Sequence, residues 1–187
     1  MLSFRDFDPY LVSRPYQLYI RYSRSYCNAM TRSATFLGMA TIWFYHLLRS
    51  GLEDELPKLL EKVQERGKRA VVMAGSPERV EALTQHLWMY SDESFLPHGN
   101  AKDGNPAEQP IWLTEADENP NGAAYLFLTD GATSEQLDAY ERCHDMFDGR
   151  DQQALAAARA RWKALKAAGH ELAYWRQKEQ GGWEKAA

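Results

Sequence analysis

Short runs of consecutive apolar residues alternate along this chain with segments of helical periodicity, and this alternation restricts the possible folds more than any other feature. The run at 69–74 (RAVVMA) carries no polar residue after its first, which is typical of a strand buried on both faces of a sheet. Between 51 and 67, apolar residues recur every three or four positions and a glycine closes the segment, as in an amphipathic helix. The alternation predicts an α/β fold, with a mostly parallel sheet and helices on both faces.

The same reasoning places the other elements. Further strands are expected at 41–46, 110–114, 123–129, 140–147 and 170–175. A helix should run from Pro77 to about Tyr90 with Ser76 as its N-cap, a helical turn should lie near 134–139, and a long Ala-rich helix should span 148–168. Residues 177–187 are expected to be a polar C-terminal tail.

Composition excludes several classes of protein. The chain has 187 residues, a hydrophobic fraction of 44% and a net charge of −4, which suit one globular domain and no obvious DNA-binding protein. Two cysteines cannot build a disulfide framework or a four-cysteine metal site, and they fit a reducing compartment such as the cytoplasm. No apolar run approaches the roughly 20 residues of a membrane span.

Residues 1–38 differ in composition from the rest of the chain. They hold five arginines, no lysine and no glutamate, and only two aspartates, which leaves 17 of the 22 basic and 24 of the 26 acidic residues to the remainder. An Arg-rich, acid-poor leader can be an organelle targeting peptide. We favour a simpler interpretation, in which translation starts natively at Met39 and residues 1–38 are a non-native or disordered extension.

The sequence contains no recognisable motif for catalysis. It has no GxxxxGK[ST] or GxGxxG phosphate loop, no GxSxG elbow and no HExxH, and its histidines are scattered singly. The turn after the second strand, GSPERV, has one glycine, and its proline removes a backbone donor. A nucleotide-dependent enzyme is the alternative function because such enzymes share the α/β architecture, although no phosphate loop supports it. No cofactor or metal is expected. Direct DNA binding is disfavoured by the net acidity of residues 39–187.

The loop SFLPHG, which follows the second helix, is a first candidate recognition surface. It is composed of Phe95, Leu96 and Pro97 with Trp88 close by, and Pro97 restricts Leu96 to extended conformations. A stiff loop that presents an aromatic side chain loses little entropy on binding and suits a partner interface. The other interpretation, that Phe95 and Trp88 cap the core, stays open at this point.

The long C-terminal helix is a second candidate. At 100° per residue one stripe is apolar and should face the core; it contains Leu155, Ala158, Trp162 and Leu165. The neighbouring stripe is basic and contains Arg159, Lys163 and Lys166. Cations beside an apolar groove would suit an acidic peptide that ends in a hydrophobic residue, whereas a merely solvated basic face is the simpler explanation.

Two stretches resemble a known family: HLW with SFLPHG, and ARARWKALKAAGHELAYW at the C-terminus. From about Met39 to Trp175 the chain resembles the chi subunits of bacterial DNA polymerase III holoenzyme. The resemblance implies a Rossmann-like α/β domain without a phosphate loop, here at 39–176. It also implies a cytoplasmic, non-catalytic replication subunit of the clamp-loader complex, within a holoenzyme that is a DNA-directed DNA polymerase, a nucleotidyltransferase.

The resemblance further implies two partners, with DNA contacted only indirectly and no membrane. The acidic, Phe-ended C-terminal tail of single-strand DNA-binding protein would bind at Arg159, Trp162, Lys163 and Lys166. Leu155 stands where the family pattern has a lysine, so this site has one cation fewer. The psi subunit, or another clamp-loader component, would contact Phe95 and its neighbours Trp88, Leu96 and Pro97, and His98 would be a loop residue without a catalytic role.

Overall fold

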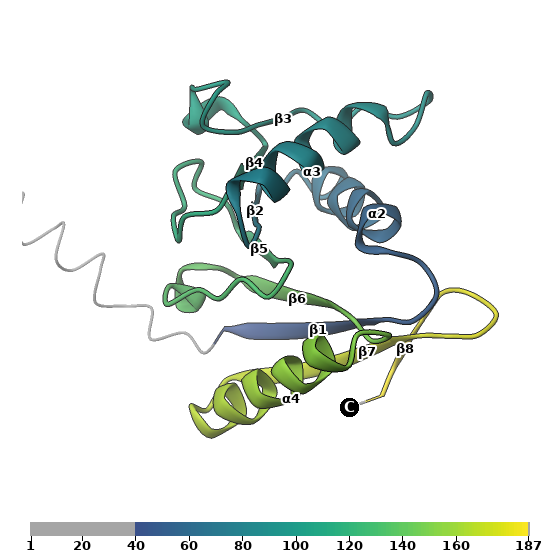
Figure 1. Ribbon diagram of the computed structural model, residues 1–187. Helices are drawn as coiled ribbons and strands as arrows, with labels where there is room; N and C mark the ends of the chain where they lie inside the picture. Colours follow the sequence, from purple (N-terminus) through teal and green to yellow (C-terminus); the bar gives the residue numbers. More distant parts are fainter. Residues whose placement is uncertain (1–39, 187) are drawn as a thin grey trace, which may run out of the picture. The chain divides into compact units, whose positions relative to one another are not determined.

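A computed structural model describes residues 40–186, so the expected N-terminal extension at 1–38 lies outside the described residues. These residues form one sheet of eight strands with three α-helices and two 3₁₀ turns (Figure 1). In chain order the elements are β1 (Thr41–Leu47), α2 (Leu52–Glu65), β2 (Ala70–Met73), α3 (Pro77–Met89), β3 (His98–Gly99), η1 (Pro106–Glu108), β4 (Ile111–Thr114), β5 (Tyr125–Leu128), η2 (Leu137–Ala139), β6 (Arg142–Asp148), α4 (Gln152–Ala167), β7 (Glu171–Gln177) and β8 (Trp183–Lys185).

The strand order across the sheet is β3-β4-β2-β5-β6-β1-β7-β8. All neighbouring strands are parallel except β7 and β8. The prediction of a mostly parallel α/β sheet is therefore confirmed, while the Rossmann-like description stays a prediction. β1 lies between β6 and β7, although both come more than 90 residues later in the chain.

The two faces of the sheet carry separate cores, because successive residues of a strand point to opposite faces. Helices α2 and α3 cover one face and α4 covers the other (Figure 1). On β1, Tyr45 and Leu47 belong to the α2–α3 core, whereas Ile42 and Phe44 belong to the α4 core. Helices on both faces were predicted from the solidly apolar strands, and this prediction is confirmed.

Local signals define the helix ends. The Ser76 hydroxyl accepts a hydrogen bond from the backbone N–H of Arg79 at 3.3 Å, as expected of an N-cap. Gly67 follows α2 with a φ of 65°, which a residue with a side chain rarely adopts. The last helix begins later than predicted, because the Asp151 carboxylate accepts from the backbone N–H of Gln153 at 2.8 Å and caps the helix there.

The segment 177–187, predicted to be a polar tail, contains a further strand. The chain turns at two consecutive glycines with positive φ, Gly181 and Gly182, and returns as β8, antiparallel to β7. Trp183 packs against the α2–α3 core, with its ring centroid 4.9 Å from that of Tyr45. A single tryptophan among polar residues therefore adds an edge strand to the sheet.

Candidate functional site

A pocket of about 310 Å³ opens between α4 and the sheet. Its walls come from strands β1, β6 and β7 and from one side of α4, and they consist of Phe44, Phe147, Leu155, Ala158, Arg159, Trp162 and Tyr174. Sequence reasoning had found Arg159 and Trp162 but missed the strand residues. The strand register explains the strand wall, because Phe44 is aligned with Tyr174, and His46, beneath the pocket, is aligned with Phe147.

Aromatic packing holds the pocket open. The Trp162 ring meets Phe44 edge-on, with centroids 5.1 Å apart, and meets Tyr174 at 5.9 Å. The Tyr174 hydroxyl and His46 Nδ1 form a hydrogen bond of 2.7 Å, and the His46 ring stacks on Phe147. Such edge-to-face and stacked pairs are favourable geometries and fix the side chains before any ligand binds.

The rim of this pocket is positively charged. Arg159 is exposed, forms no ion pair within residues 40–186, and lies beside aromatic walls that include no carboxylate. Burial lowers the pKa of the nearby His46, and the positive charges of Arg176 and, to a smaller extent, of Arg159 lower it further. Lys163 and Lys166 are exposed on the same helix but do not line the pocket.

Arg161 has a different role from Arg159, its neighbour two residues away. Its guanidinium donates two hydrogen bonds to the Asp145 carboxylate of β6, at 2.7 and 2.8 Å. The Asp145 side chain is only 3% exposed and that of Arg161 18% exposed. Burial raises the pKa of Asp145 above its usual value, while the guanidinium beside it acts in the opposite direction. The pair anchors α4 to the sheet and leaves Arg159 facing solvent.

A second candidate surface lies at the end of α3. Trp88 and Phe95 are 56% and 65% exposed, and their ring centroids are 5.8 Å apart. Met89, the last residue of α3, which sequence reasoning missed, is 75% exposed. Pro97 is partly buried. The loop thus presents Phe95 outward, and the interpretation of Phe95 as a core cap is wrong.

Leu96 does not belong to this surface. It is 1% exposed and packs in the α2–α3 core, so we remove it from the predicted partner interface. His98 is also buried, in the short strand β3. Its Nδ1 lies 2.7 Å from the Leu96 carbonyl oxygen and its Nε2 lies 3.1 Å from that of Thr84. The loop therefore turns a leucine inward and fixes its path with the histidine, and this arrangement leaves Phe95 on the outside.

The turn at Gly75–Pro77, where a phosphate loop would lie, is closed by protein atoms. A Cβ on Gly75 would lie 2.9 Å from the carbonyl oxygen of Asp130. Arg79 forms ion pairs with Glu53 at 2.9 Å and with Asp130 at 3.1 Å. Two carboxylates and a close backbone contact at this point disfavour a phosphate group, which weakens the alternative of a nucleotide-dependent enzyme with its site at this turn.

Residues 40–186 contain neither a metal-binding cluster nor a membrane-spanning helix. No group of three or more histidine, cysteine, aspartate or glutamate side chains is arranged to hold a metal ion there. None of the helices in that part of the chain is both long and apolar enough to cross a membrane.

Comparison with known proteins identifies a family. Residues 39–173 match the family described as DNA polymerase III chi subunit, HolC. A probable DNA polymerase III subunit chi of Rickettsia prowazekii (strain Madrid E) is 33% identical over 84 residues, which cover 45% of this chain and 51% of that protein. This chain thus spans about half the length of the curated relative. Members of the family are accessory subunits of DNA polymerase III and are not catalytic by themselves. Because the family match extends over well more than half of the 187 residues, this chain belongs to the DNA polymerase III chi subunit family.

Proposed function

We propose that this protein is a non-catalytic adaptor of the DNA polymerase III clamp-loader complex, which it links to the C-terminal tail of single-strand DNA-binding protein. One observation carries the proposal: a preformed aromatic pocket lies directly beside an arginine that has no ion-pair partner among the described residues. The role belongs to DNA replication in the cytoplasm, and DNA is reached only through the partner.

The pocket suits a peptide that ends in a hydrophobic residue and has acidic residues immediately before it. The tail's last side chain would enter between Phe44 and Trp162, where edge-on aromatic contacts are available. Arg159 would bind a carboxylate with its planar fork, and Lys163 and Lys166 would attract the preceding acidic residues. Leu155 removes a cation from the rim but contributes an apolar wall instead.

The surface formed by Trp88, Met89 and Phe95 would bind the psi subunit or another clamp-loader component. Three large exposed apolar side chains beside a rigid loop are typical of an interface centre. α3 and α4 cover opposite faces of the sheet (Figure 1), so both partners can bind at once. An adaptor requires this separation of its two binding sites.

Calorimetric titration tests the tail site. The full chain is titrated with a peptide that copies the last nine or so residues of the cognate single-strand DNA-binding protein, at low and moderate salt. Binding should weaken as salt rises, because exposed charges are screened, and it should vanish when the terminal Phe is removed. Arg159→Gln should weaken the free energy of peptide binding by about 1.5–3 kcal/mol, the usual contribution of a hydrogen bond to a charged group.

Lys58→Gln provides the matched control. Lys58 is an exposed cation on α2, on the other face of the sheet, and among residues 40–186 it pairs only with Glu55, at 3.0 Å. This variant makes the same change in net charge and should bind the peptide as the unaltered chain does. Equal weakening by both variants would mean that net charge, and not the α4 pocket, controls binding, and would contradict the site.

A further inference from the structure

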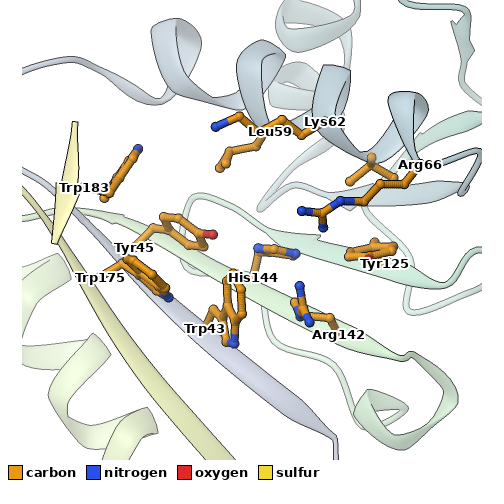
Figure 2. A pocket seen from close by; sticks show the side chains of 11 residues that line it. Trp43, Tyr45, Leu59, Lys62, Arg66, Tyr125, Arg142, His144, Trp175 and Trp183 are labelled. Atoms are coloured by element: carbon orange, nitrogen blue, oxygen red, sulfur yellow. The ribbon is translucent and has the colours of Figure 1, made fainter. Parts of the chain in front are cut away.

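A second cavity of about 200 Å³ lies on the opposite face of the sheet, between α2 and strands β1, β6 and β7 (Figure 2). Three tryptophans, three cations and a histidine line it, and no acidic side chain does. Figure 2 shows Arg66 and Arg142 near His144, and Tyr45, Trp175 and Trp183 farther from Arg66, with the Lys62 amine pointing towards Trp183. The two arginines thus form a cationic end and these three rings an aromatic end, and Trp43 lies between them, beneath the Arg142 guanidinium.

The cationic end is not neutralised by the protein. Lys62, Arg66 and Arg142 form no ion pair with any residue in 40–186. The Arg142 guanidinium lies over the Trp43 ring, 4.0 Å from its centroid, and its buried Nε has no hydrogen-bond partner among the described residues. Three cations around one small cavity repel one another, so an anion of more than one negative charge would be bound favourably.

His144 is an unpartnered polar group at the base of this cavity. It is 4% exposed and stacks on Phe127 with centroids 4.4 Å apart, and neither ring nitrogen has a hydrogen-bond partner in residues 40–186. Burial, together with Arg142 and Arg66, lowers the pKa of His144 to about 3, so the ring is neutral at physiological pH. A neutral imidazole offers one donor and one acceptor, and leaving both unused is costly.

The aromatic end has a similar unused donor. The rings of Trp43 and Trp175 lie 5.3 Å apart, and the buried Nε1 of Trp175 has no partner among the residues that the structure describes. An apolar side chain placed here would leave the donors of Trp175, Arg142 and His144 unsatisfied. A planar ring with polar edges would both stack on the indoles and bond to these atoms.

We propose that this cavity binds a nucleotide, with its phosphate held by Arg66 and Arg142, its base against Trp43 and Trp175, and Lys62 adding positive charge at the rim. Guanidinium groups bind phosphate oxygens in pairs, and three cations match the two charges of a phosphate monoester better than the single charge of a carboxylate. The nucleotide can be free, or it can be part of a single strand that brings two or more singly charged phosphodiesters to the three cations, and the cavity is separate from the α4 pocket.

Indole signals in the ¹H–¹⁵N spectrum of the full chain test this proposal, because they separate Trp43 and Trp175 from Trp162. The probes are dTMP, thymidine, inorganic phosphate and a ten-residue oligo(dT). We expect dTMP to shift the Trp43 and Trp175 signals and not that of Trp162, with at least tenfold weaker binding of thymidine and of phosphate. Tighter binding of oligo(dT) than of dTMP would identify single-stranded nucleic acid as the source, and weaker binding would identify the free nucleotide.

Charge variants complete the test. Arg66 is exposed at the end of α2, so Arg66→Gln should stay folded and weaken dTMP binding by at least fivefold, whereas Lys58→Gln on the same helix should not change it. Arg142→Gln should weaken binding at least as much, and circular dichroism verifies that each variant is folded. The proposal is overturned if millimolar dTMP and oligo(dT) leave both indoles unshifted, or if a Phe-ended acidic peptide shifts these two signals and not that of Trp162.

Discussion

Replacing Arg161 should lower the free energy of unfolding much more than replacing Arg159, although both are arginines on α4 two residues apart. Arg161→Ala leaves the Asp145 carboxylate, 3% exposed, without the two hydrogen bonds that now compensate its burial. Breaking a buried pair in this way costs about 3–5 kcal/mol. Because Arg161 itself is 18% exposed, water can replace part of its contact, and we expect the lower end, about 3 kcal/mol.

Urea denaturation followed by circular dichroism measures this difference. With a denaturant slope of about 2 kcal/mol/M, the midpoint for Arg161→Ala should fall by roughly 1.5 M. Arg159→Ala should stay within about 0.5 kcal/mol of the unaltered chain, because the side chain is exposed and unpaired among the described residues. Adding Asp145→Asn to Arg161→Ala should recover part of the loss, since the buried charge is then gone.

The pH dependence gives a second check on the same pair. The folded-state pKa of Asp145 is already raised, and without the guanidinium it must rise further. A carboxyl group with a raised folded-state pKa favours folding when protonated, so the deficit of Arg161→Ala should shrink as the pH falls below neutrality. Equal midpoints for Arg161→Ala and Arg159→Ala at neutral pH would refute the reasoning, because the buried pair would then contribute nothing that an exposed arginine lacks.

Three further predictions concern single side chains. Burial raises the pKa of the Cys143 thiol to about 12, so at pH 8 about one thiol in ten thousand is ionised. In a Cys27→Ser variant, where Cys143 is the remaining cysteine, a thiol-specific reagent should therefore react only after denaturant is added. Trp183→Ala should lower the free energy of unfolding by about 1–2 kcal/mol in urea titrations, because a half-buried ring that packs on Tyr45 is lost, and an unchanged midpoint would mean that β8 contributes nothing. The pKa of His144 is lowered to about 3 from 6.5, so the protein should lose about 1 kcal/mol of stability per pH unit as the pH falls from 6.5 towards 3. The variant His144→Phe should lack this slope and should be at least as stable at pH 7. An equal loss of stability with acid in the variant would contradict the assignment.

Patterns of consecutive residues carried most of the fold prediction. The apolar run at 69–74 contains β2, and the Ser76–Pro77 pair marks the start of α3 within one residue. Helical periodicity also identified Arg159 and Trp162 as neighbours of one groove, and both line the α4 pocket. These features depend on spacing along one element, which a sequence displays directly.

Features that depend on contacts between distant segments were missed. β8 has no strand pattern of its own and forms because β7 offers an unpaired edge. Leu96 was predicted to be exposed together with Phe95, yet the turn sends adjacent side chains in opposite directions. The second cavity combines residues of α2 and five strands, and His144 had been regarded as one of several isolated histidines. The binding roles of all the predicted site residues that remain stay predictions: Arg159, Trp162, Lys163 and Lys166 for the tail, and Trp88, Phe95 and Pro97 for the other partner.

The position of β1 has a consequence for how this chain is made on the ribosome. β1 is the first strand of the described part, yet both of its neighbours come late: Thr41 is aligned with Arg142 of β6 and with Glu171 of β7. Strands β2 to β5 with α2 and α3 can pair locally as they emerge, whereas β1 must wait for about 100 residues more of synthesis. During that time the strand TIWFYHL, with three consecutive aromatic residues, has no partner and is exposed to aggregation. A nascent chain stopped before β6 should therefore require a chaperone that holds extended aromatic segments, and release of a chain that includes β7 should remove that requirement.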